Sequence, residues 1–187
     1  MSLPSDNPAL PPRVRGLTLV SALALLVAGL GLFFAPSIVR PLWPWQMGAY
    51  SGFFWGAVCL AALSAVAVVL YYAHWWPARL VLPMLVAFSG SELIVSLLNV
   101  QRFHWERWTT WVWFGLNLGL PLLLGEYLWR HRGQPPPEAY PTPENWSRLL
   151  QILALELGLY GMGLFLLPAL FGAFWPWTVD SFSGQLY

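Results

Sequence analysis

Long apolar runs separated by short polar stretches dominate this chain. Uninterrupted apolar runs of about 18 residues or more are typical of transmembrane helices, since a helix satisfies its own backbone polar groups in lipid. The pattern therefore predicts an all-α protein, a helical transmembrane bundle of five spans. The predicted spans are Leu17–Ala35, Ala49–Tyr72, Leu80–Val100, Thr109–Trp129 and Leu149–Phe171.

One stretch of the chain returns near its C-terminus. Gly31–Trp55 and Gly163–Tyr187 align without a gap at an offset of 132 residues, and Gly, Leu, Phe, Pro, Trp-Pro-Trp and Ser-Gly recur in register. This match predicts a partial internal repeat, which has to be recognised before the fold is assigned. The expected organisation is a cytoplasmic N-terminal segment (1–16), a four-span repeat (17–132), a cytoplasmic Pro-rich loop (133–148) and a truncated second repeat of one span plus an outer-surface tail (149–187).

Composition agrees with a membrane protein. Hydrophobic residues make up 58% of the 187 residues and charged residues only 9%, with no lysine, whereas soluble domains carry about 25% charged residues. A net charge of +1 argues against nucleic-acid binding. The single cysteine, Cys59, allows no internal disulfide, and no metal-ligand spacing occurs. The sequence thus predicts no metal site and assigns no cofactor.

The arginines predict the orientation in the membrane. Cytoplasmic loops carry an excess of basic residues, so the side with more arginines is expected to face the cytoplasm. This places the N-terminus inside and the C-terminus outside, in what we expect to be a bacterial inner membrane. The inner side would hold Arg13, Arg15, Arg79, Arg130, Arg132 and Arg148, and the outer side Arg40, Arg102 and Arg107.

Tryptophans cluster in the predicted links between spans. Tryptophan is enriched at membrane–water interfaces, because its ring is apolar and its N–H is polar. The two Trp-Pro-Trp links are expected in this interfacial layer; a cradle for a quinone, sterol or pigment is the alternative. The interfacial residues predicted here are Trp43, Trp45, Trp175 and Trp177.

Polar residues inside the spans are the candidates for chemistry. Four of them, at spacings of three, four and three, share one face of the third span. Glu92 lies near the middle of that span, where a carboxyl group is costly unless it finds a partner. Either it belongs to a proton, ion or ligand site, or it is a protonated side chain that joins two helices. The candidates are Ser89, Glu92, Ser96 and Asn99, with Asn117 and Glu156 as helpers from other spans.

Glycines four residues apart let helices approach closely. Gly52 and Gly56 in the second span, and Gly115 and Gly119 in the fourth, are expected to form such packing faces. No nucleophile motif, phosphate-binding loop or metalloprotease motif occurs, so the sequence predicts no catalytic residues and no enzyme activity.

The Trp43-Pro44-Trp45 link resembles that of a group of uncharacterised bacterial multi-span membrane proteins. The resemblance extends through Pro77-Ala78-Arg79, Gln101–His104 and Trp111-Val112-Trp113, and covers most of residues 17–132. It departs from the group at Gln46–Ala49, where that group has a Thr-Pro-Leu-Thr-like turn. The resemblance implies a membrane protein and no particular activity.

Three functions remain open. The leading hypothesis is a non-catalytic accessory or structural subunit that packs against other membrane subunits or forms a homo-oligomer in the lipid bilayer, because the fifth span lacks the partner helices of the first. The second is a small transporter or ion- or proton-translocating protein that uses Glu92. A weaker third is a cofactor-binding subunit of an electron-transfer complex.

Overall fold

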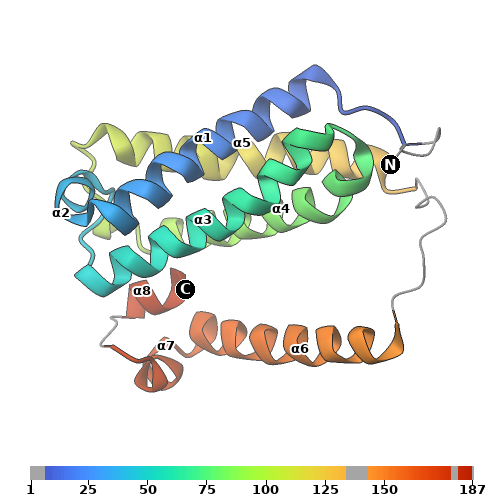
Figure 1. Cartoon of the computed structure of the whole chain (residues 1–187). Coiled ribbons are helices and arrows are strands. Elements are labelled where there is room, and N and C mark those ends of the chain that lie inside the picture. Colours follow the sequence, from blue (N-terminus) through green and yellow to red (C-terminus); the bar gives the residue numbers. More distant parts are fainter. Residues whose placement is uncertain (1–6, 134–142, 178–180, 187) are drawn as a thin grey trace. The chain divides into compact units, whose positions relative to one another are not determined.

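The computed structural model describes residues 7–133, 143–177 and 181–186, which form helices and no β-strand (Figure 1). The all-α prediction is therefore confirmed for this part of the chain. The chain divides into two compact units, Met1–Pro137 and Glu138–Tyr187.

Unit 1 is a bundle of four long helices. α1 packs along α3, and α4 packs along α5 (Figure 1). The long helices are α1 (Pro12–Phe34), α3 (Ala49–Tyr72), α4 (Trp75–Leu98) and α5 (Trp108–His131), and the short ones are α2 (Pro36–Val39), η1 (Arg40–Leu42) and η2 (Val100–Arg102).

Unit 2 contains one long helix and three short elements. They are α6 (Glu144–Leu166), α7 (Pro168–Phe171), η3 (Gly172–Phe174) and α8 (Ser181–Leu186). Within this unit α6 contacts α7 and α8.

Four helices of the described chain are long and apolar enough to cross a membrane: α1, α3, α4 and α6. They fit an integral membrane protein. α5 has the same length as its neighbours but is not one of the four. Its threonines, tryptophans and Asn117 lower its hydropathy. The structure thus supports four of the five predicted spans.

Three helices begin several residues earlier than their predicted spans. α1 starts at Pro12 rather than Leu17, and α6 starts at Glu144 rather than Leu149 and ends at Leu166 rather than Phe171. α4 starts at Trp75 rather than Leu80, so the predicted link before Leu80 is helical. Pro77 is compatible with this start, because the first-turn N–H groups of a helix have no acceptor within it. An apolar run marks the residues that contact lipid or the protein interior. The helix itself extends beyond that run for as long as its backbone hydrogen bonds continue.

A short N-terminal segment ties two helix ends together. Leu10 N donates to Ala73 O at 2.8 Å, Trp75 N donates to Pro8 O at 2.9 Å, and Trp76 N donates to Asn7 Oδ1 at 3.0 Å. The start of α1 therefore lies beside the turn between α3 and α4. Of the predicted cytoplasmic segment 1–16, residues 1–6 lie outside the described residues.

The elements of unit 2 match those at the start of unit 1 at a constant offset. α6, α7 and η3 begin and end 132 residues after α1, α2 and η1. The breaks between the helices also match: Ala35 has φ −133° and ψ 51°, and Leu167 has φ −132° and ψ 56°. At each break an amide N–H donates to the glycine four residues earlier, Gly31 at 2.9 Å and Gly163 at 2.8 Å.

These two glycines serve the same local fold. A Cβ at Gly31 would lie 2.7 Å from Val39, and a Cβ at Gly163 would lie 2.5 Å from the ring of Phe171. Each glycine lets the short helix after the break fold back on the long helix before it. The Pro-Pro-Pro stretch of the predicted Pro-rich loop lies outside the described residues.

Candidate functional site

The polar face predicted on the third span lies in the interior of unit 1. Ser89, Glu92 and Ser96 of α4 are all buried, and Glu92 is 3% exposed. Asn99 differs, because it follows the last residue of α4 and is only half-buried, with its Nδ2 donating to Val95 O at 3.0 Å. The sequence-based face therefore holds for three of its four members.

One hydrogen bond fixes the register between α4 and α5 at this face, and a second orients Asn117 within α5. Trp113 Nε1 donates to Ser96 Oγ at 2.9 Å, and Asn117 Nδ2 donates to Trp113 O at 3.0 Å. Glu92 lies one helical turn from Ser96, and Asn117 lies one turn from Trp113 in the opposite direction along the sequence. Since the two helices are antiparallel, Glu92 and the buried Asn117 occupy the same level of the bundle.

Glu92 is the least satisfied member of the face. Its Oε2 is buried and has no hydrogen-bond partner in the described part of the chain. Ser89 offers no hydrogen to it in this geometry, because its hydroxyl donates to Leu85 O. A buried carboxyl oxygen without a partner is costly, so Glu92 is the best candidate for a proton or ligand to bind.

Aromatic rings close the end of unit 1 next to this face. Trp45 is 1% exposed and lies at the centre of the cluster. Its ring centroid is 4.8 Å from that of Trp113, 5.4 Å from Phe103 and 5.5 Å from Trp43. Trp43 and Trp45 are thus buried in protein. That this end of unit 1 lies at a membrane–water interface stays a prediction.

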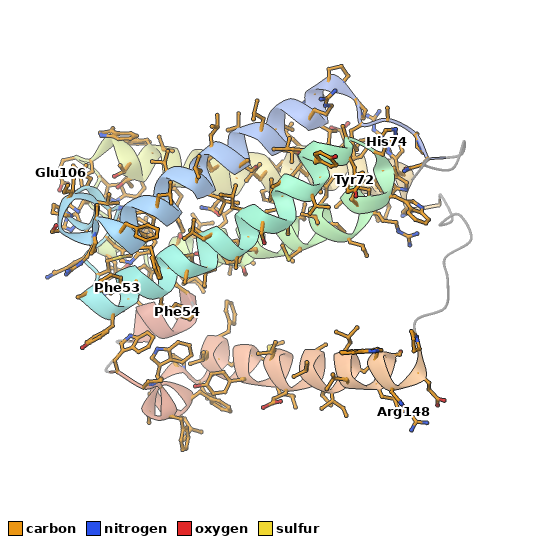
Figure 2. The ribbon with its side chains drawn as sticks, viewed as in Figure 1. Phe53, Phe54, Tyr72, His74, Glu106 and Arg148 are labelled. Atoms are coloured by element: carbon orange, nitrogen blue, oxygen red, sulfur yellow. The ribbon has the colours of Figure 1, made fainter. Side chains whose placement is uncertain are left out.

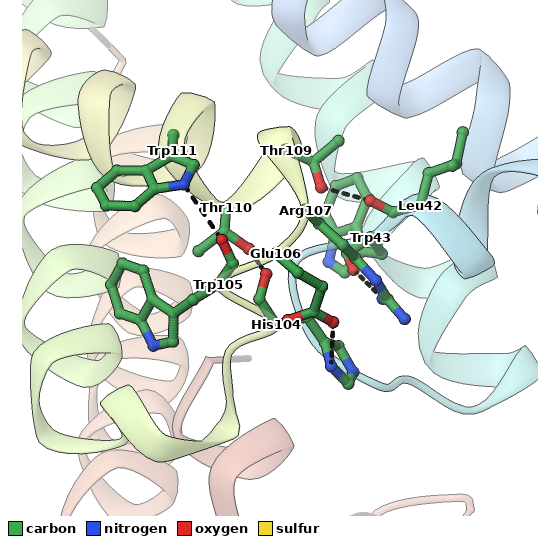
Figure 3. A network of polar contacts seen from close by, with 9 residues as sticks. All are labelled: Leu42, Trp43, His104, Trp105, Glu106, Arg107, Thr109, Thr110 and Trp111. Carbon is green, nitrogen blue, oxygen red and sulfur yellow. Dashed lines mark hydrogen bonds and ion pairs between the residues drawn. The ribbon is translucent and has the colours of Figure 1, made fainter.

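Polar contacts join the first link of unit 1 to the loop before α5 and to the first turn of α5 (Figure 3). Arg107 Nη1 donates to Trp43 O at 2.5 Å, and Thr109 Oγ1 donates to Leu42 O at 2.5 Å. His104 N donates to Pro44 O at 2.8 Å. The sequence predicts only an outer-side charge for Arg107 and no role for Thr109. The signal for both was their position directly before an apolar run, where side chains reach neighbouring carbonyl groups.

The two predicted glycine faces have different surroundings. A Cβ at Gly56 would lie 2.7 Å from Phe33 N, so this glycine is needed for the contact between α1 and α3. Gly52 faces Arg40 and Met47. Gly115 and Gly119 of α5 have nothing within 4 Å of an added Cβ. The face on α3 is therefore used inside unit 1, and the face on α5 is open there.

Unit 2 holds the remaining predicted residues. Trp175 and Trp177 are in edge contact, with ring centroids 5.3 Å apart, and Trp175 stacks with Tyr160. Glu156 of α6 is exposed and makes no hydrogen bond or ion pair to a described residue. The structure thus gives Glu156 no partner in its own unit.

No group of His, Cys, Asp or Glu side chains that could hold a metal ion occurs in the described residues. Comparison with known proteins finds no matching family model, no similar curated protein and no similar solved structure. The resemblance to bacterial multi-span membrane proteins therefore stays a prediction.

Proposed function

We propose that this chain is an integral membrane protein that acts as a non-catalytic subunit, packing against another membrane protein or a second copy of itself. The observation that carries this proposal is Glu156. It lies near the middle of α6, one of the four candidate membrane-crossing helices, and its carboxyl group is exposed.

A bare carboxyl group at this depth needs a partner. A charged side chain at the centre of a membrane helix costs on the order of 3 kcal/mol, and intramembrane carboxyl groups are normally paired. In unit 2, the main contacts of α6 are with α7 and α8, and neither offers Glu156 a hydrogen bond. We expect a partner subunit to supply the missing donor.

The proposal includes an internal repeat and a fifth span. The constant offset of 132 residues between α1–α2–η1 and α6–α7–η3 supports the repeat. Among the described residues, the second repeat contains a counterpart of α1 but none of α4 or α5. We propose that the chain has five spans and lies in a bacterial inner membrane. The arginine distribution supports a cytoplasmic N-terminus.

Native mass spectrometry after mild detergent extraction tests this function. We expect the wild-type chain to leave the membrane in a stoichiometric complex. Glu156→Leu should reduce the complex about tenfold, which corresponds to the loss of roughly 1.4 kcal/mol of binding free energy.

Glu144→Gln is the matched control on the same helix, because Glu144 is exposed and paired with Arg148 at 2.5 Å. This variant should keep the complex. A wild-type chain that is extracted only as a monomer would contradict the proposed function.

Glu92 favours a second candidate function, translocation of protons or cations. Its buried, unpartnered Oε2 at the level of Asn117 is the feature that supports it. Buried carboxyl groups within membrane helices commonly bind the transported ion or proton. The side-chain oxygens of Ser89 and Asn117 are the polar groups on this face that we propose coordinate a cation bound at Glu92.

A flux assay in proteoliposomes tests this candidate. With a pH-sensitive dye inside the vesicles, the wild-type chain should dissipate an imposed pH gradient and Glu92→Gln should reduce the rate to that of empty vesicles. Glu126→Gln is the control, because Glu126 is half-exposed and pairs with Arg130 at 2.6 Å. An unchanged rate in Glu92→Gln, with unfolding temperatures equal in all three proteins, would rule out this function.

A further inference from the structure

α3 packs closely on a face of α1 that is formed by Gly29 and Phe33. Leu60 of α3 lies over Gly29 of α1, since a Cβ at Gly29 would be 2.9 Å from Leu60 Cγ and Cδ2. One turn away the roles reverse, and the backbone of Phe33 in α1 lies over Gly56 of α3. Each helix thus contributes one glycine notch and one bulky group, four residues apart, in an antiparallel pair.

The same face recurs on α6, but among the described residues of unit 2 no long helix packs against it. Gly161 and Phe165 are the residues 132 positions after Gly29 and Phe33. Gly29 is buried, whereas Gly161 is exposed and has nothing within 4 Å of an added Cβ. Inside unit 2 the notch that Leu60 fills in unit 1 is empty.

α8 does not fill this notch. It begins 132 residues after α3 and covers the counterparts of the first six residues of α3. Gln185 Nε2 of α8 donates to Phe165 O at 3.3 Å. α8 therefore takes the place of the first turns of α3, before the positions where Gly56 and Leu60 face α1.

We propose that α6 binds a transmembrane helix of another protein, antiparallel to α6, with a small residue and a leucine four positions later. The small residue lies over Phe165 and the leucine fills the notch at Gly161. This proposal rests on the proposed subunit function and names the chemistry of the partner. A second copy of this chain is less suited, because the one described helix known to fit, α3, already has its matching face covered by α1.

The equivalence is strongest in the second half of α6. Nearer its start, Leu150 and Leu153 replace the buried Thr18 and Ser21 of α1. Larger side chains hold a neighbouring helix farther away. The partner helix should therefore lie closest at Gly161 and diverge toward the start of α6.

A peptide with the sequence of residues 55–72 of α3 is the probe for this site, because α8 already takes the place of the first six residues of α3. The full chain carries a donor fluorophore at Asn145→Cys in a Cys59→Ala background, and the peptide carries an acceptor at either end. Both are reconstituted in vesicles of phosphatidylcholine and phosphatidylglycerol. We expect energy transfer to saturate with peptide, and to be higher for the C-terminal acceptor, because an antiparallel peptide ends near the start of α6.

Substitutions on both sides define the contact. Gly161→Ile should weaken peptide binding about tenfold or more, since it fills the notch that close helix approach requires. Gly56→Ile or Leu60→Ala in the peptide should do the same. Gly158→Ile is the matched control, because Gly158 also has open space around it and corresponds to the exposed Leu26 of α1. It should bind like the wild type.

The outcomes separate this inference from the proposed function. No peptide binding, or equal binding by the Gly161→Ile and Gly158→Ile chains, would overturn the inference. Loss in Gly161→Ile of association between two copies of the chain, measured with donor- and acceptor-labelled chains, would make a second copy the occupant and also overturn it. In either case a stoichiometric complex in native mass spectrometry leaves the subunit function standing.

Discussion

At the scale of single residues, Ala73 is the clearest point of strain. It follows the last residue of α3 with φ 51° and ψ 34°, the only non-glycine residue with positive φ in the described chain. A left-handed conformation costs a residue with a Cβ roughly 1–2 kcal/mol, whereas glycine adopts it freely. The position persists because Ala73 N donates to Val69 O and Ala73 O accepts from Leu10 N, both at 2.8 Å.

We predict that Ala73→Gly stabilises unit 1. Relief of the strained conformation exceeds the added entropy of the unfolded chain by about 0.5–1 kcal/mol. Thermal unfolding in detergent should show a higher midpoint.

Ala57→Gly is the matched control, because Ala57 is exposed in the interior of the same helix. That change should destabilise by about 1 kcal/mol. A midpoint that falls in both variants would show that the conformation of Ala73 carries no strain.

At the scale of helices, the sequence predicts where elements lie better than what they face. Glu92, Ser89 and Ser96 were placed together from their spacing alone, because 3.6 residues per turn fixes which side chains share a helix face. Their partner on α5 could not be read in the same way. Trp113, whose Nε1 reaches Ser96, looks in sequence like any interfacial tryptophan.

The glycine motifs show the same limit. Gly52-x-x-x-Gly56 and Gly115-x-x-x-Gly119 have one spacing and opposite surroundings, since Gly56 touches the backbone of Phe33 and Gly115 and Gly119 touch nothing. The Gly-x-x-x-Gly spacing shows that another helix can pack closely against the motif. Only the tertiary structure shows whether a helix packs there. The burial of Trp43 and Trp45 shows the same limit. It depends on Phe103 and Trp113, which are distant in sequence, so the local pattern of the link does not predict it.

At the scale of the whole molecule, α5 determines whether the number of spans is four or five. α5 is too polar to qualify by hydropathy, but its polar residues Thr110 and Asn117 are buried in unit 1. Lipid would meet its exposed side, which includes Trp111, Leu118 and Leu122. The mean hydropathy of a helix counts residues on both sides, so it understates how apolar the lipid-facing side is.

The pairing of α5 with α4 runs from end to end. Trp113, near the start of α5, bonds to Ser96 near the end of α4, and Tyr127, near the end of α5, contacts the ring of Trp75, the first residue of α4. α4 is a candidate membrane-crossing helix of 24 residues, about 36 Å long. We therefore expect a helix that follows α4 over this length to cross the same layer.

Cysteine labelling across α5 tests this argument. Glu106 lies before α5 at one end of unit 1, opposite the end with Tyr72 and His74 (Figure 2), and Gly133 follows α5. In a Cys59→Ala background, we expect Glu106→Cys to react with an impermeant maleimide in intact cells, and Gly133→Cys to react only after permeabilisation, because the excess of arginines marks the cytoplasmic side. Reaction of both from the same side would show that α5 does not cross. Reaction of Gly133→Cys alone in intact cells would keep the crossing and reverse the orientation, which would mean that arginine distribution does not govern the topology of this protein.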